Sequence, residues 1–103
     1  MNKTEQEFDR AVTLCRGTFE AKLRDYGAAW RRMRPSSVTD QIRIKADRIR
    51  SLETKGNQRV TDEGILDGFV AIVNYGVIAL IQCAHGFASG KDMTPDQAIA
   101  LYD

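Results

Sequence analysis

The sequence predicts an all-α fold, a bundle of four to five helices in one domain that spans residues 1–103. Apolar residues recur at spacings of three and four along most of the chain, which is the pattern of amphipathic helices rather than strands. Residues that start and stop helices separate these segments. With 43% apolar and 28% charged residues, the composition is that of a soluble globular domain and not of a disordered chain.

The first helix is predicted over residues 4–26. Thr4 and Glu7 have the spacing of a capping box, and Gly27 stands where a left-handed C-terminal cap is expected. Between these ends an apolar stripe recurs at helical spacing, formed by Phe8, Val12, Cys15, Phe19, Leu23 and Tyr26. A short turn is then expected to run to Pro35.

The second helix is predicted to open at Ser36 and to end before a polar loop at 54–59. At about 100° per residue, Lys45 falls inside its apolar stripe, and Arg48 and Gln41 border that stripe. These three polar side chains are therefore expected to face the core or a cleft, while Arg43 and Asp47 lie on the opposite side.

The third segment, residues 62–85, is apolar nearly all the way round and predicts a central buried helix, capped by Thr61 or Asp62 and ended by Gly86. Its longest apolar stretch, Ile65 to Ile81, is interrupted by polar residues and glycines and, at about 17 residues, is short of a convincing membrane span. One flank of small residues would let another helix approach closely and makes a dimer plausible; it consists of Gly64, Gly68, Ala71 and Ala79.

The last helix is predicted to begin at Thr94, with Pro95 at its first position and Gln97 completing a capping box. Only a few residues follow before Asp103. The shortness of this helix favours a continuation or a partner that covers its end.

The central segment carries the clearest chemical signal. Glu63, Asn74 and Asp67 fall within about 40° of one another on a helical projection. Two carboxylates four residues apart repel each other, and more strongly when desolvated. A cation is therefore expected beside them. Mg²⁺ or Mn²⁺ is one candidate, and an internal salt bridge from Lys45 or Arg48 is the other.

Charge is divided unevenly along the chain. Residues 24–50 hold eight Lys/Arg against three Asp, whereas residues 61–103 hold six acids against one Lys. A basic half beside an acidic half suits an anionic ligand held together with a metal ion, and it equally suits attraction between solvated helices. Tyr26 and Trp30 lie near the basic stretch, where they would stack on a base or complete the core.

Several classes of protein are disfavoured. The polar N-terminus predicts no export signal and hence a cytoplasmic protein, in which Cys15 and Cys83 are free thiols. No zinc motif, nucleophilic triad or glycine-rich phosphate loop is present. A net charge of +1 argues against binding of duplex DNA.

Several sequence blocks carry a family resemblance. They are residues 22–31, 33–41 and 45–50, then Asp62-Glu63-Gly64 and Asn74-Tyr75-Gly76. Together they resemble nucleotide modification associated domain 1 over about residues 8–103. The resemblance implies a bacterial or phage protein of nucleotide metabolism or DNA-base modification, and a chain similar to the first copy of a tandem pair, with a homodimer as the alternative to the second copy.

The layout is also similar to MazG-type all-α nucleoside triphosphate pyrophosphohydrolases, in which acids from two neighbouring helices hold Mg²⁺ against a triphosphate. The closely spaced glutamates of an earlier helix are missing here, and Asp25, Asp40 and Glu20 are their nearest replacements.

From these resemblances we expect a magnesium-dependent nucleotide-binding domain, with hydrolysis between the α- and β-phosphates as its candidate reaction. The alternative is a non-enzymatic binding or assembly module whose acids are neutralised internally. The expected roles are metal binding by Glu63 and Asp67 with Asp25 or Asp40, catalysis by Glu63, Asp67 and Lys45, and substrate binding by Arg48, Asn74, Trp30, Tyr26, Gln41 and Arg31.

Overall fold

The structure is a computed structural model, and it describes residues 2–54, 58–86 and 93–103, with the backbone alone for residues 58–61. Within these ranges it contains helices and no strand, so the all-α prediction is confirmed. The elements are α1 (Lys3–Tyr26), the 3-10 helix η1 (Ala29–Arg32), α2 (Pro35–Glu53), α3 (Gln58–His85) and α4 (Pro95–Tyr102).

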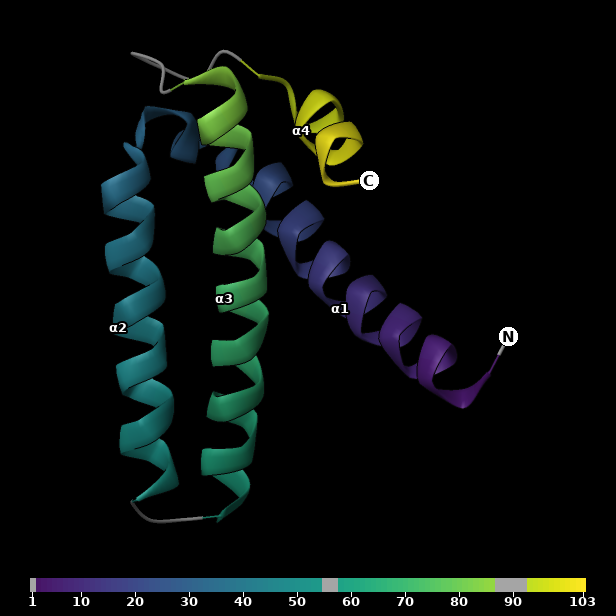
Figure 1. The fold of residues 1–103 in the computed structure, drawn as a ribbon, viewed down its shortest axis with the longest axis vertical. Helices are drawn as coiled ribbons and strands as arrows, with labels where there is room; N and C mark the ends of the chain where they lie inside the picture. Colours follow the sequence, from purple (N-terminus) through teal and green to yellow (C-terminus); the bar gives the residue numbers. More distant parts are fainter. Residues whose placement is uncertain (1, 55–57, 87–92) are drawn as a thin grey trace.

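The helices α2 and α3 form an antiparallel hairpin (Figure 1). Gly68 permits their close contact, because a Cβ atom at this position would lie 2.7 Å from Cγ1 of Ile49. At Gly64, a Cβ atom would lie 2.8 Å from Cδ1 of Leu52. The predicted close approach at the small-residue flank is therefore confirmed at these two glycines, and the helix that approaches is α2 of the same chain.

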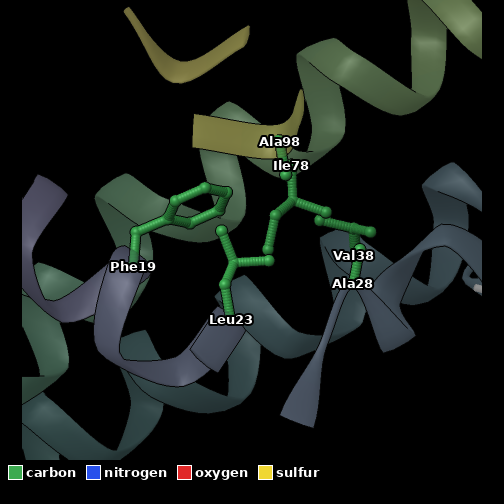
Figure 2. Close-up of a cluster of buried hydrophobic side chains, with 6 residues drawn as sticks. All are labelled: Phe19, Leu23, Ala28, Val38, Ile78 and Ala98. Atoms are coloured by element: carbon green, nitrogen blue, oxygen red, sulfur yellow. The ribbon is translucent and has the colours of Figure 1, made fainter. Parts of the chain in front are cut away.

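The helix α1 crosses α3 at an angle, and α4 lies beside the C-terminal half of α1 (Figure 1). Their packing encloses one core in which side chains from α1, α2, α3 and α4 meet (Figure 2). This core contains Phe19, Leu23, Ala28, Val38, Ile78 and Ala98. The Phe19 ring packs against Tyr102 of α4 at a centroid distance of 4.9 Å, and Arg16 holds the Asp103 carboxylate through two hydrogen bonds of 2.7 and 3.0 Å.

The N-terminal half of α1 projects away from the rest of the molecule (Figure 1). Residues 2–14 are all exposed, including the apolar Phe8, Val12 and Leu14. The radius of gyration is 14.9 Å, compared with about 13 Å for a compact domain of this length. The chain by itself therefore leaves part of the amphipathic face of α1 uncovered.

Several helix ends differ from the sequence prediction. The cap of α1 is Asn2, whose side chain accepts from the Glu5 amide, and not Thr4. The first turn of α2 contains Pro35, with Arg34 as its cap. In α3 the helix begins at Gln58, so Thr61 and Asp62 lie inside the helix and not at its start. Residues 55–57 of the predicted loop lie outside the described residues.

Other helix ends were predicted correctly. Gly27 and Gly86 end α1 and α3 with positive φ values of 67° and 71°, which glycine adopts without strain. Thr94 and Gln97 form both hydrogen bonds of the expected capping box. Each of these helix ends was predicted from at most four consecutive residues, so no contact with a distant part of the chain had to be known.

The helix α3 differs from the fully buried rod that its composition predicts. Its segment Asp62–His85 is long and apolar enough to cross a membrane, a test that the core helix of a soluble protein also passes. Only 28% of the most apolar part is buried within the molecule. The neighbouring helices cover two sides of α3, and its third side carries exposed leucine, phenylalanine and valine side chains.

Candidate functional site

A cavity of about 670 Å³ lies between α1, η1, α2 and α3. This volume is within the range of pockets that bind small molecules, about 300–1,000 Å³. Most of its wall is apolar, and a few polar side chains reach it from three helices. The polar and aromatic lining residues are Thr18, Phe19, Lys22, Tyr26, Trp30, Lys45, Asp67, Asn74 and Tyr75.

The charged groups of the cavity come from three different helices. Lys22 lies on α1, Lys45 on α2 and Asp67 on α3. Lys45 is partly buried, and Asp67 is exposed. Among the described residues, no ion pair within 4 Å joins Asp67 to Lys45. The internal salt bridge that was the alternative to a bound cation therefore does not form between these two groups.

Lys45 is placed at the cavity by the packing of α2 on α3. Gly68 lets α2 approach so closely that a Cβ atom at position 68 would stand 4.0 Å from the Lys45 carbonyl oxygen. Asp67 is the residue before this glycine. The closest contact of the hairpin thus also sets the spacing between the two charged residues that the sequence pattern singled out.

Aromatic side chains form another part of the wall. Tyr26 ends α1 and is largely exposed, Trp30 lies in η1 and is partly buried, and Tyr75 lies on α3. The Trp30 ring packs against Phe19 with the ring centroids 6.0 Å apart. Trp30 therefore completes the core, which is one of its two predicted roles, and it also lines the cavity.

Gln82 fixes η1 against α3. Its side-chain amide donates to the carbonyl oxygens of Trp30, Arg31 and Met33 at 3.1, 2.9 and 2.7 Å. Its side-chain oxygen accepts from the Arg31 guanidinium. Gln82 is 1% exposed, and because its amide has only two N–H groups, at least one of them is shared between two of these carbonyl oxygens. These bonds hold η1, and with it Trp30, against α3.

Arg31 has a structural position. Its guanidinium is buried and donates to the Gly86 carbonyl oxygen at 2.6 Å as well as to Gln82. A cation at the C-terminal end of a helix interacts favourably with the helix dipole. Arg31 is absent from the cavity lining, so the structure places this expected substrate-binding residue beside the end of α3 instead.

Asn74 joins three helices. Its side-chain amide donates to the Cys15 carbonyl oxygen at 3.0 Å, and its side-chain oxygen accepts from the Tyr102 hydroxyl at 2.9 Å. Burial raises the pKa of Tyr102, which keeps this hydroxyl protonated and able to donate. Asn74 reaches the cavity wall as predicted, but its amide is already engaged in holding α1 and α4 on α3.

The structure brings five of the predicted residues to one cavity: Tyr26, Trp30, Lys45, Asp67 and Asn74. The other predicted residues, which lie outside its lining, are Asp25, Arg31, Asp40, Gln41, Arg48 and Glu63. In the ranges 2–54, 62–86 and 93–103, no three His, Cys, Asp or Glu side chains are grouped closely enough to hold a metal ion. The four expected metal ligands are thus not assembled within the described part of the chain.

Four residues of the site were not predicted from the sequence, and Thr18 in the cavity wall is one of them. Lys22 and Tyr75 line the cavity, and Gln82 positions its wall. Lys22 lies one helical turn before Tyr26, a spacing that places the two side chains on the same face. Gln82 has an amide side chain and stands in an apolar stretch of α3. A polar side chain in such a stretch indicates a buried group with hydrogen-bond partners.

A family model described as nucleotide modification associated domain 1 matches residues 22–83. The matched segment contains every charged and aromatic residue of the cavity wall except Phe19. No curated protein and no solved structure matches the chain.

Proposed function

We propose that the chain, which belongs to the nucleotide modification associated domain 1 family, binds a nucleotide in the cavity between α1, η1, α2 and α3. The observation that carries this proposal is the composition of the wall. Two lysines, one carboxylate and three aromatic rings from the family-matched segment line the same cavity of about 670 Å³.

The aromatic groups suit a base. Base stacking on an aromatic side chain contributes about 1–3 kcal/mol, and Tyr26, Trp30 and Tyr75 offer rings at the wall. Trp30 is the best placed of the three, because Gln82 and Phe19 hold it in position. A ring that is already ordered loses less entropy on binding than a free one does.

The lysines suit phosphates. Lys22 and Lys45 approach the cavity from α1 and α2, so one anion between them would contact both helices. Asp67 would repel that anion unless a cation intervened. Mg²⁺ binds through one or two carboxylates together with phosphate oxygens and water, so a single aspartate fits a metal that arrives with the nucleotide. We propose Asp67 as the ligand in that complex.

Thermal unfolding of the protein with a panel of nucleotides, with and without MgCl₂, tests binding. A ligand at 100 times its Kd stabilises a protein by about 2.7 kcal/mol. Lys45→Gln should weaken binding by about 10- to 100-fold, because hydrogen bonds to charged groups contribute about 1.5–3 kcal/mol. Arg43→Gln is the matched control, since it removes one positive charge from an exposed position of the same helix.

The results separate the parts of the proposal. Stabilisation by nucleoside triphosphates but by neither nucleosides nor pyrophosphate supports a site for both base and phosphate. A requirement for MgCl₂ that Asp67→Asn abolishes supports the role of Asp67. If no nucleotide raises the unfolding temperature, or if Lys45→Gln and Arg43→Gln behave alike, the cavity is not a nucleotide site.

Cleavage of a nucleoside triphosphate between its α- and β-phosphates is the finer proposal. Asp67 beside Lys45 at the cavity favours it, because a metal-bound water and a phosphate clamp are what such a reaction needs. Pyrophosphate release is measured for the wild type, Asp67→Asn and Glu63→Ala. Release that falls in Asp67→Asn supports catalysis at the cavity, and a fall in Glu63→Ala as well would extend the site to this residue outside the lining. Binding without release from any nucleotide identifies a non-enzymatic module.

A further inference from the structure

The exposed side of α3 carries a regular apolar stripe. Its residues are spaced by three, four, three, four and three positions and are Leu66, Phe69, Val73, Gly76, Leu80 and Cys83. This alternation is the a and d pattern with which helices pack in coiled coils. Leu66, Phe69, Val73 and Leu80 are 52%, 55%, 47% and 73% exposed, and Cys83 is exposed as well.

The other contacts of α3 leave this stripe free. Gly64 and Gly68 receive α2, and Asn74 and Gln82 bond to α1 and η1. On a helical projection the centre of the stripe lies about 130° from the two glycines and about 170° from the two amides. It is therefore a third face of the helix, separate from the hairpin contact and from the cavity.

We propose that this stripe is the interface with a second copy of the chain, in which the two α3 helices pack antiparallel across a twofold axis between positions 74 and 75. In this register Leu66 lies opposite Cys83 of the partner subunit, and Phe69 lies opposite the partner's Leu80. Val73 lies opposite Gly76 of the partner subunit.

At two of the three paired positions a larger side chain faces a smaller one, while Phe69 and Leu80 are both large. Nothing lies within 4 Å of the place where a Cβ atom of Gly76 would stand, so the glycine leaves room for a valine. Leucine likewise faces the smaller cysteine at both ends of the stripe. Such alternation of large and small residues lets facing helices interdigitate.

The distribution of charge favours the antiparallel arrangement. Asp62 and Glu63 stand near the N-terminal end of the stripe. The C-terminal end of α3 contacts the basic segment η1, because Arg31 donates to the Gly86 carbonyl oxygen, and the next residue, Arg32, is exposed. Antiparallel packing places each acidic end beside the basic end of the other copy, whereas parallel packing would place like charges together.

The exposed apolar area of the stripe is about half of the area that each partner buries in a stable interface, which corresponds to a dimer of modest affinity. The four large side chains expose about 400 Å² together, taking roughly 150–250 Å² for a full side chain of this kind. A stable interface buries about 800 Å² per partner, so polar groups at the rim of the stripe would supply the rest. A membrane surface is a poorer occupant, because residues 62–86 contain acids and no Lys or Arg, and anionic lipid attracts basic helices.

Sedimentation equilibrium at micromolar concentrations measures the mass in solution. The wild type should be a dimer, and Val73→Glu should be a monomer because it places a charge at the centre of the interface. Ile44→Glu is the matched control, since Ile44 is equally exposed but lies on α2. It should remain dimeric. Circular dichroism of all three proteins shows whether each keeps its helices.

Oxidative crosslinking tests the register without disrupting the stripe. Leu66→Cys should give a disulfide-linked dimer through Cys83 of the partner subunit, and the wild type should give none through Cys83 alone. A crosslinked wild type would indicate parallel packing and would overturn the proposed arrangement. A monomeric wild type, or binding of the stripe to lipid vesicles in place of dimerisation, would overturn the interface itself. Neither result would affect nucleotide binding at the cavity.

Discussion

Replacement of Gly68 by alanine tests the contact on which the candidate site is built. The new methyl group would stand 2.7 Å from Cγ1 and 2.9 Å from Cδ1 of Ile49. Cγ1 is attached directly to the branched Cβ atom of isoleucine, so it moves only if the χ1 angle or the backbone of α2 moves. Ile49 is buried, which leaves little room for such a shift.

Two opposing effects determine the stability of Gly68→Ala. Extra volume in a packed contact costs about 1–3 kcal/mol, and alanine is favoured over glycine within a helix by about 0.8–1.0 kcal/mol. We expect a net loss of about 1 kcal/mol, or about 4–8 °C in Tm for a domain of this size. Displacement of α2 should also move Lys45 and weaken nucleotide binding.

Two other glycines calibrate this measurement. Gly17 is exposed on α1 with nothing near its missing Cβ atom, so Gly17→Ala should stabilise the protein by about 0.8–1.0 kcal/mol. Gly64→Ala should fall between the two, because it meets the flexible end of Leu52. Urea unfolding of all three variants at one protein concentration gives the order. If Gly68→Ala is as stable as Gly17→Ala, the α2 and α3 helices do not pack as described.

Two further predictions concern buried and terminal contacts. Gln82→Leu should destabilise the protein by about 3 kcal/mol or more in urea unfolding, since it leaves the Arg31 guanidinium and three carbonyl groups short of partners; a loss below 1 kcal/mol would show that η1 is held by other contacts. The Arg16 guanidinium lowers the pKa of Asp103 from 3.8, so the ionised carboxylate stabilises the fold above that pH, and this contribution disappears as the pH falls through the lowered pKa. The stability difference between wild type and Asp103→Asn should therefore shrink in acid, and a difference that stays constant would contradict the ion pair.

The fold could be predicted from the sequence where neighbouring residues alone determine the structure, as they do at several helix ends. The positive φ values at Gly27 and Gly86 and the capping box at Thr94 follow from residue types within one turn. The start of α3 was misplaced because Thr61 and Asp62 are good caps, but the helix continues back to Gln58. Capping preference is worth about 1 kcal/mol, so a strong cap residue does not by itself end a helix.

The candidate site was predictable in part for a similar reason. Helical projection correctly directed Lys45, Asp67 and Asn74 toward a shared space, since the faces of α2 and α3 are fixed by their apolar residues. It could not show how far along each helix the contact with α1 extends. Glu63 and Arg48 lie one turn or so from residues of the wall, yet they are outside the lining. How far the cavity wall extends along these helices depends on where α1 crosses α3, which is a property of the tertiary structure.

The two amides of α3 explain how an apolar helix holds a polar site in one arrangement. Apolar packing alone tolerates sliding between helices, because any contact of similar volume serves. Asn74 and Gln82 each bond to fixed backbone carbonyl oxygens of another segment, and a shift of one turn would leave these buried groups unpaired at a cost of about 1–3 kcal/mol each. Asn74 thereby fixes α1, which carries Lys22 and Tyr26, and Gln82 fixes η1, which carries Trp30. Asn74, which resembles a ligand in sequence, and Gln82, which does not, thus act chiefly by positioning the residues that face the cavity.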